Sequence, residues 1–126
     1  MIDIELVLAI HDTILNEEPG LKGRPDRGKL ESALARIDNW MLYENTENIF
    51  DIAALYAVAI AKSHAFPDGN KRTALVTMLT YLDLQGVEVP ANHHLDDVMV
   101  EVAAGERDFI SLSHYLQKIT KEEISS

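Results

Sequence analysis

The run from His64 to Thr73, HAFPDGNKRT, combines a side chain that can accept a proton with side chains that can bind a phosphate. His64 follows a strongly apolar stretch of helical character, so we expect it at a helix C-terminus, where the helix dipole favours a protonated imidazole. Because histidine titrates near neutral pH, it suits a base that takes a proton from a hydroxyl group. The run therefore predicts a proton acceptor beside a phosphate site, in a nucleotide-handling loop.

The next part of the run predicts a metal ligand and a backbone anion site. Asp68 offers the hard carboxylate oxygens that suit Mg²⁺, which normally arrives together with the phosphates of a substrate. Gly69 lets a ligand approach the backbone closely, and we expect the free N–H groups of residues near 70 to 73 to open a helix and point at an anion. We therefore expect Mg²⁺ to be bound by both the Asp68 carboxylate and the phosphates of the substrate.

Three further side chains strengthen the phosphate interpretation. Lys71 adds a point charge, Arg72 a planar fork for two phosphate oxygens, and Asn70 an amide donor. Phe66 is expected to anchor the loop in the core. Each of these residues alone is better explained as loop structure, but their conjunction within nine residues favours a functional site.

The elements that must position this loop are all predicted to be helices, because apolar residues recur every three or four positions and no strand alternation is found. Their number and short connections indicate a compact all-α bundle of six helices in a single domain, residues 1–126. The first helix is predicted from Ile4 to about Asn16, and the second begins after Asp26 as N-cap and fades near Asn39. The third covers 51–63, and the fourth covers 70–85 and is ended by Gly86. The last two are built on Leu95 to Val102 and on Leu112 to Ile119. The two most apolar, 51–63 and 70–85, should form the central scaffold, and Glu17 to Lys29 should be an exposed loop or short hairpin.

Composition limits the possible partners and compartment. The formal net charge is −10 with only 11 Lys and Arg, which argues against direct nucleic-acid binding and requires concentrated local positive charge for any ATP. No apolar run approaches the length of a membrane span, and the N-terminus lacks the pattern of a signal peptide. Cysteine is absent, which fits a reducing compartment. We therefore expect a cytoplasmic protein.

The run resembles the signature of the Fic/Doc superfamily, and most closely that of its death-on-curing (Doc) branch, HxFxDxNKRT. Seven positions of that signature are matched as they stand. The resemblance extends to His11-Asp12, to the Gly20 to Gly23 segment and to Leu30 through Leu34, so it covers most of the chain. The matched signature residues are His64, Phe66, Asp68, Asn70, Lys71, Arg72 and Thr73.

Two departures from the pattern of adenylylating Fic proteins, HPFxxGNGRxxR, bear on the reaction. Lys71 takes the place of the second glycine, and Leu75 stands where the last arginine would be. The resemblance implies that the lysine fills the anion site used by those enzymes, so that ATP binds reversed and presents its γ-phosphate. The implied protein is a toxin of a toxin–antitoxin pair, a kinase that uses ATP and Mg²⁺ to phosphorylate a threonine of elongation factor Tu and so inhibits translation.

The resemblance also implies roles for single residues. His64 and Asp68 are the catalytic residues, as general base and Mg²⁺ ligand, while Gly69, Asn70, Lys71 and Arg72 bind the nucleotide phosphates. A flap that docks the extended target segment is assigned to Leu21, Lys22, Gly23 and Arg24. The internal inhibitory string of many Fic proteins, S/TxxxE followed by Gly or Asn, is not found, so inhibition is expected from a separate antitoxin acting in trans.

Three alternatives remain open at the level of the sequence. The first is AMP transfer by a Fic-type adenylyltransferase. The second is a metal phosphohydrolase, because His11-Asp12, His93-His94 and Asp96-Asp97 could be parts of a metal centre, although neighbours on a helix diverge by about 100°. His11 is better explained as a core histidine with a satisfied hydrogen bond. The third is a non-catalytic helical binding module.

Overall fold

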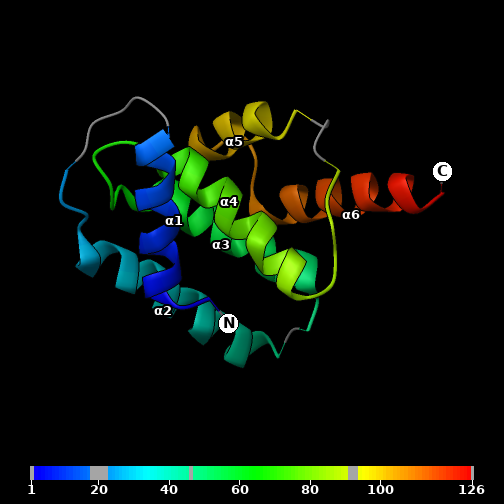
Figure 1. Cartoon of the computed structure of the whole chain (residues 1–126). Helices are drawn as coiled ribbons and strands as arrows, with labels where there is room; N and C mark the ends of the chain where they lie inside the picture. Colours follow the sequence, from blue (N-terminus) through cyan, green and yellow to red (C-terminus); the bar gives the residue numbers. More distant parts are fainter. Residues whose placement is uncertain (1, 18–22, 46, 91–93, 126) are drawn as a thin grey trace.

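The computed structural model describes residues 2–17, 23–45, 47–90 and 94–125, and all regular structure in these ranges is helical (Figure 1). The helices are α1 (Ile4–Glu17), α2 (Arg27–Glu44), α3 (Ile49–Ser63), α4 (Asn70–Leu84), α5 (Leu95–Ala103) and α6 (Phe109–Ser125). The predicted all-α fold of six helices is thereby confirmed. None of the described helices is both long enough and apolar enough to cross a membrane.

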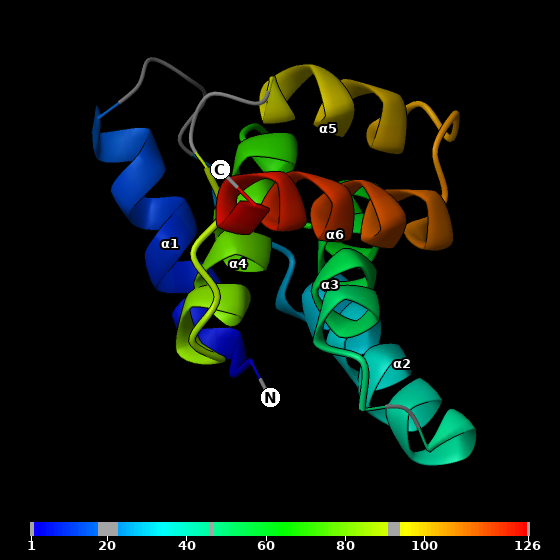
Figure 2. The same ribbon diagram turned by 90° about the vertical axis from the view of Figure 1, so that its right-hand side faces the viewer.

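Helices α3 and α4 lie side by side at the centre of the bundle (Figures 1 and 2). They contact each other more extensively than any other pair of helices; α3 also contacts α2, α5 and α6, and α4 contacts α1 and α5. Small side chains on α3 let the neighbouring helices approach closely. The predicted central scaffold is confirmed, with full burial of Ala53, Ala54, Ala57 and Ile60 on α3 and of Ala74, Met78 and Leu82 on α4.

The helix ends follow the capping chemistry of the sequence. The Asp26 carboxylate accepts a hydrogen bond from the Lys29 N–H at 3.1 Å, which confirms the predicted N-cap of α2. Asn48 caps α3 in the same way. After α4 the chain turns at Gly86, whose φ of 83° lies in the left-handed region that glycine adopts readily. Three of the helix boundaries were therefore encoded locally.

Helix α2 is longer than predicted. The periodic pattern ends it near Asn39, but the helix continues to Glu44. The ring of Trp40 packs edge-on against Phe109 of α6, with 5.5 Å between ring centroids, and this long-range contact lies beyond the point where the apolar stripe fades. The helix stops only at Asn45, which has a left-handed φ of 50°.

Polar contacts between distant segments hold the outer helices to the centre. Helix α6 lies across α3 (Figure 2), and there Ser113 Oγ donates to the Asp51 carboxylate at 2.5 Å. Near the start of the chain, the Ile2 N–H donates to the hydroxyl of Tyr56 on α3 at 2.9 Å. These contacts fix α1 and α6 on the α3–α4 pair, from which the connecting loop emerges.

Candidate active site

The predicted chemistry lies in the loop of residues 64–69 that joins α3 to α4. Phe66 is 3 % exposed and anchors the loop in the core, as expected. Asn70, the first residue of α4, binds the Phe66 backbone twice: its Oδ1 accepts from the N–H at 3.2 Å, and its Nδ2 donates to the carbonyl at 2.8 Å. The Asn70 amide therefore closes the loop, a structural role that the sequence did not indicate.

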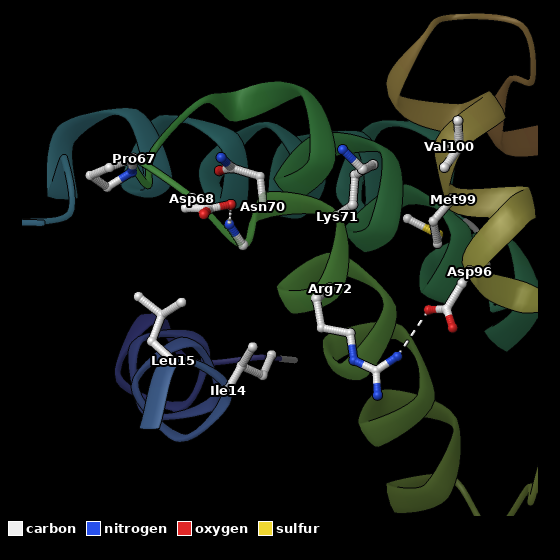
Figure 3. Close-up of a pocket in the computed structure, with 11 residues that line it drawn as sticks. Ile14, Leu15, Pro67, Asp68, Asn70, Lys71, Arg72, Asp96, Met99 and Val100 are labelled. Carbon is white, nitrogen blue, oxygen red and sulfur yellow. Dashed lines mark hydrogen bonds and ion pairs between the residues drawn. The ribbon is translucent and has the colours of Figure 1, made fainter. Parts of the chain in front are cut away.

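A cleft of about 490 Å³ lies between α1, this loop, α4 and α5 (Figure 3). Its volume falls within the roughly 300–1,000 Å³ typical of small-molecule sites. Most of its apolar wall comes from α1 and α5, and its polar wall comes from the loop, the start of α4 and Asp96 of α5. The lining residues are Ile14, Leu15, Pro67, Asp68, Gly69, Asn70, Lys71, Arg72, Asp96, Met99 and Val100.

The N-terminus of α4 faces this cleft. Gly69, the N-cap residue, has φ 82° and no side chain with which to cap the helix. The opening N–H groups are those of residues 70–72, because the Thr73 N–H already donates to the Gly69 carbonyl at 2.9 Å. The expectation that Thr73 also contributes an N–H to an anion was therefore wrong. Three N–H groups at the positive end of a helix dipole remain a suitable anion site.

Two cationic side chains stand at the same end of α4. Lys71 and Arg72 are both exposed and both line the cleft. Arg72 extends toward α5, where its Nη1 lies 2.9 Å from Oδ1 of Asp96 (Figure 3). Both side chains of this pair are substantially exposed, at 43 % and 75 %, and such pairs contribute only about 0–1 kcal/mol. A phosphate entering the cleft can therefore compete with Asp96 for the guanidinium.

The Asp68 side chain is the carboxylate that the loop itself brings to the cleft. It is exposed, and its Oδ1 accepts from the Gly69 N–H at 2.8 Å. Mg²⁺ in phosphoryl-transfer sites is commonly held by one or two carboxylates with substrate phosphates and water. A single carboxylate beside an anion site fits that donor set. Among the described residues, no three His, Asp or Glu side chains form a group that could hold a metal ion by themselves.

His64 has a different position from the other predicted residues. It is exposed and ends α3 in a left-handed conformation with φ 53°, but it is not among the residues that line the cleft. The end of the loop and the start of α4 thus bring Asp68, Gly69, Asn70, Lys71 and Arg72 to one cavity, and the imidazole stays at the solvent-exposed beginning of the loop.

The predicted flap is described only in part, since Leu21 and Lys22 lie outside the described residues. Gly23 packs directly against the side chain of Pro67, so closely that a Cβ at Gly23 would overlap the proline ring. Arg24 is exposed. Just beyond, a backbone hydrogen bond of 2.6 Å joins Asp26 N–H to the Ala65 carbonyl. The end of the flap is thus attached to the active-site loop at two points.

His11 confirms the expectation of a core histidine with a satisfied hydrogen bond. It is 5 % exposed, and its Nε2 lies 2.8 Å from the Asp68 carbonyl. Its ring also stacks on Phe66 at 3.8 Å between centroids. A nitrogen committed to a backbone carbonyl does not serve a metal, which disfavours the phosphohydrolase alternative; His93 lies outside the described residues.

The sequence did not indicate that α5 forms a wall of the cleft. Asp96, Met99 and Val100 follow the loop by more than twenty residues, and Asp96 was considered only as a piece of a metal centre. A possible signal was the pair of acids in the first turn of α5, which would place a carboxylate near any neighbouring cation. Without knowledge of helix packing, that neighbour could not be named.

Comparison with known proteins agrees with this architecture. Residues 1–82 match the sequence pattern described as the Fic/DOC family. The chain belongs to the Fic/DOC family. It is 36 % identical over 115 residues to "Protein kinase doc" of Escherichia phage P1, a match covering 91 % of each chain. It is also 35 % identical over 92 residues to "Toxin Doc" of Mycolicibacterium smegmatis, covering 70 % of this chain and 71 % of that protein.

The family match covers α1 to most of α4, and therefore the whole loop and the α1 wall of the cleft. The α5 wall, with Asp96, Met99 and Val100, lies beyond residue 82. The Fic/DOC pattern thus covers the cationic end of the cleft, whereas the opposite wall is formed by a part of the chain outside that match.

Proposed function

We propose that this Fic/DOC protein is the toxin of a toxin–antitoxin pair and acts as a protein kinase. Its two relatives carry the names "Protein kinase doc" and "Toxin Doc". The observation that carries the proposal is the cleft in which the Asp68 carboxylate, two cationic side chains and the N-terminus of α4 face one cavity. The cofactors are ATP and Mg²⁺, the protein substrate is a threonine of elongation factor Tu, and the inhibitor is a cognate antitoxin acting in trans.

The proposed reaction transfers the γ-phosphoryl group of ATP to the threonine hydroxyl. A bond forms between the hydroxyl oxygen and the γ-phosphorus, the bond from the γ-phosphorus to the bridging oxygen breaks, and ADP leaves. Lys71, Arg72 and the N–H groups of residues 70–72 stabilise the charge on the phosphate oxygens. Bound Mg²⁺, held in part by Asp68, supplies further positive charge at the phosphates.

His64 is proposed as the base that takes the hydroxyl proton. A base acting on a side chain of another protein must be reachable from outside, and His64 is exposed at the beginning of the loop. It follows the last residue of α3 directly, so the central helix fixes the start of the loop that carries it. Gly23, which packs against Pro67 of this loop, and Arg24 belong to the flap that docks the target segment, and just beyond them Asp26 is bonded to the Ala65 carbonyl.

The test is incubation of the purified protein with ATP, Mg²⁺ and elongation factor Tu, followed by mass spectrometry of the intact factor and its peptides. The expected result is the added mass of one phosphoryl group on a threonine. Addition of an adenylyl group would instead support AMP transfer and would contradict the role given to Lys71. An unmodified factor would contradict the proposed substrate, and treatment of a whole lysate would then reveal any other target.

The non-catalytic alternative is separated by a cellular experiment. If the chain acts only as a helical binding module, His64→Ala should still arrest growth, because one exposed side chain outside the cleft contributes little to binding. The proposal predicts loss of growth arrest with fold and antitoxin binding intact.

A further inference from the structure

The buried His11 contacts the active-site loop at Phe66 and Asp68 and lies beside Gly69. Its ring stacks on Phe66 with 13° between the ring planes, and its Nε2 lies 2.8 Å from the Asp68 carbonyl. A Cβ built on Gly69 would lie 3.5 Å from the imidazole. His11 comes from α1, 57 positions before Asp68, so an outer helix supports the loop that carries the phosphate and metal ligands.

The direction of the hydrogen bond is fixed by its acceptor. A carbonyl oxygen only accepts, so the imidazole carries its proton on Nε2 and donates it. This assignment holds whatever the state of Nδ1.

The bond controls more than the carbonyl itself, because a peptide unit is planar. The carbonyl of Asp68 and the N–H of Gly69 belong to one peptide plane. The two groups point in opposite directions within the plane. His11 binds the carbonyl oxygen at one edge, and at the opposite edge the N–H donates to Oδ1 of Asp68 at 2.8 Å. The orientation of the plane therefore couples the imidazole to the carboxylate.

This peptide needs such a restraint, because Gly69 follows it. Glycine populates positive and negative φ about equally, so a peptide next to glycine can rotate to its opposite orientation at low cost. Gly69 has φ 82° in this loop. If the plane rotated, the N–H would turn away from the carboxylate, and Asp68 would lose a contact that helps to orient it toward the cleft.

We propose that His11 is a positioning residue, which holds the Asp68–Gly69 peptide in one orientation and thereby places the Asp68 carboxylate for Mg²⁺. The step toward Mg²⁺ rests on the proposed kinase function; the restraint on the peptide does not. The ring stack on Phe66 fills the core, and the Nε2 proton sets the geometry of the turn.

Two substitutions separate these contributions. His11→Phe keeps an aromatic ring on Phe66 and removes the donor, whereas His11→Gln removes the stack and places an amide donor at a similar reach. Donor loss should increase hydrogen exchange of the Gly69 amide about tenfold and raise the Mg²⁺ concentration for half-maximal turnover by about the same factor. His11→Gln should stay within about threefold of the native protein in both measurements. His114→Phe, an exposed position on α6, is the control for histidine replacement.

The amide measurement by NMR requires no activity, so it decides the positioning role even if no phosphoryl transfer is found and the kinase proposal fails. If His11→Phe does not fold, as judged by circular dichroism, the smaller His11→Leu replaces it in the comparison. Native-like exchange and Mg²⁺ dependence in the donor-free variant would overturn the inference. Equal impairment in His11→Gln would also overturn it, because it would show that packing alone matters.

Discussion

At the scale of single residues, His64 combines exposure with a left-handed backbone at the end of α3. It adopts φ 53°, and left-handed backbone costs a residue with a Cβ roughly 1–2 kcal/mol. Glycine would end α3 there without this cost, and the imidazole is exposed, so burial does not compensate. A strained, exposed histidine at the start of the α3–α4 loop fits the chemical role proposed for it.

The first prediction follows from that strain. His64→Gly should leave the free energy of unfolding unchanged or raise it by up to about 1 kcal/mol, because the left-handed strain is relieved at some cost in chain entropy. The same variant should lose roughly two to four orders of magnitude in turnover if His64 is the general base. Urea unfolding and a phosphoryl-transfer assay measure the two effects. A variant that is destabilised but fully active would reverse the argument.

The second prediction concerns the charge of Asp68. Asp68→Asn keeps an oxygen that can accept from the Gly69 N–H, so the turn and the stability should be preserved. It removes the carboxylate, and turnover should fall by about 100-fold or more with a raised requirement for Mg²⁺. Steady-state rates across a Mg²⁺ titration provide the measurement. Unchanged rates would remove the metal role from Asp68.

At the scale of elements, the active site depends on how four segments meet at the α3–α4 loop. Asn70 closes the loop from α4, His11 supports it from α1, and Asp96 pairs with Arg72 from α5. The flap reaches it through the contact of Gly23 with Pro67. Each contact joins residues from separate elements or from the two sides of a turn, so the loop can be disturbed from any of these neighbours.

The third prediction tests the flap contact. In Gly23→Ala the new methyl group would overlap the Pro67 ring, so the flap must shift away from the loop. The KM for the protein substrate should rise several-fold, while the affinity for nucleotide should change less, because Gly23 itself does not line the cleft and only its neighbour Pro67 does. Steady-state kinetics with varied protein substrate and calorimetry with ATP give the two values.

Gly28→Ala is the matched control for this substitution. It lies in α2, and a Cβ there would meet only the Asp26 carboxylate, at 3.4 Å. Because alanine favours helix, this variant should keep native kinetics and should not lose stability. If both alanine variants raised the KM equally, the effect could not be attributed to the contact with Pro67.

The limits of sequence-based prediction are also set at this scale. The helices around the loop could be predicted because their signals are local: the stripe of α3, the Asp26 cap and the Gly86 turn each lie within a few residues of what they specify. The end of α2 and the α5 wall could not, because Trp40 finds its partner on α6 and Asp96 finds Arg72 across the cleft. Periodicity shows which face of a helix is buried, but not against which neighbour.

At the scale of the whole molecule, the buried tyrosines of α3 and α4 connect the centre of the bundle to the start of the chain. Tyr56 is fully buried, its hydroxyl accepts from the Ile2 N–H, and its ring lies 5.5 Å from that of Tyr81. Burial raises the pKa of both phenols above the ordinary value of 10.0. Stability should therefore depend on pH at the alkaline end.

The fourth prediction gives the sign of that dependence. Below about pH 10 the folded and unfolded chains both keep the phenol protons, so these groups do not make the free energy of unfolding depend on pH. Above it the unfolded chain loses its protons first, which favours unfolding, and the free energy of unfolding falls as the pH rises toward the raised pKa of the folded tyrosines. Tyr56→Phe should lose about 1 kcal/mol at neutral pH with the Ile2 contact, and should show a shallower alkaline decline. Urea titrations from pH 7 to about 11.5 measure both effects.

Tyr43→Phe, at a side chain that is 89 % exposed, is the control for general repulsion in a chain of net charge −10. Because that repulsion acts equally on both variants, an identical alkaline slope in Tyr56→Phe and Tyr43→Phe would show that the buried phenol does not link folding to pH.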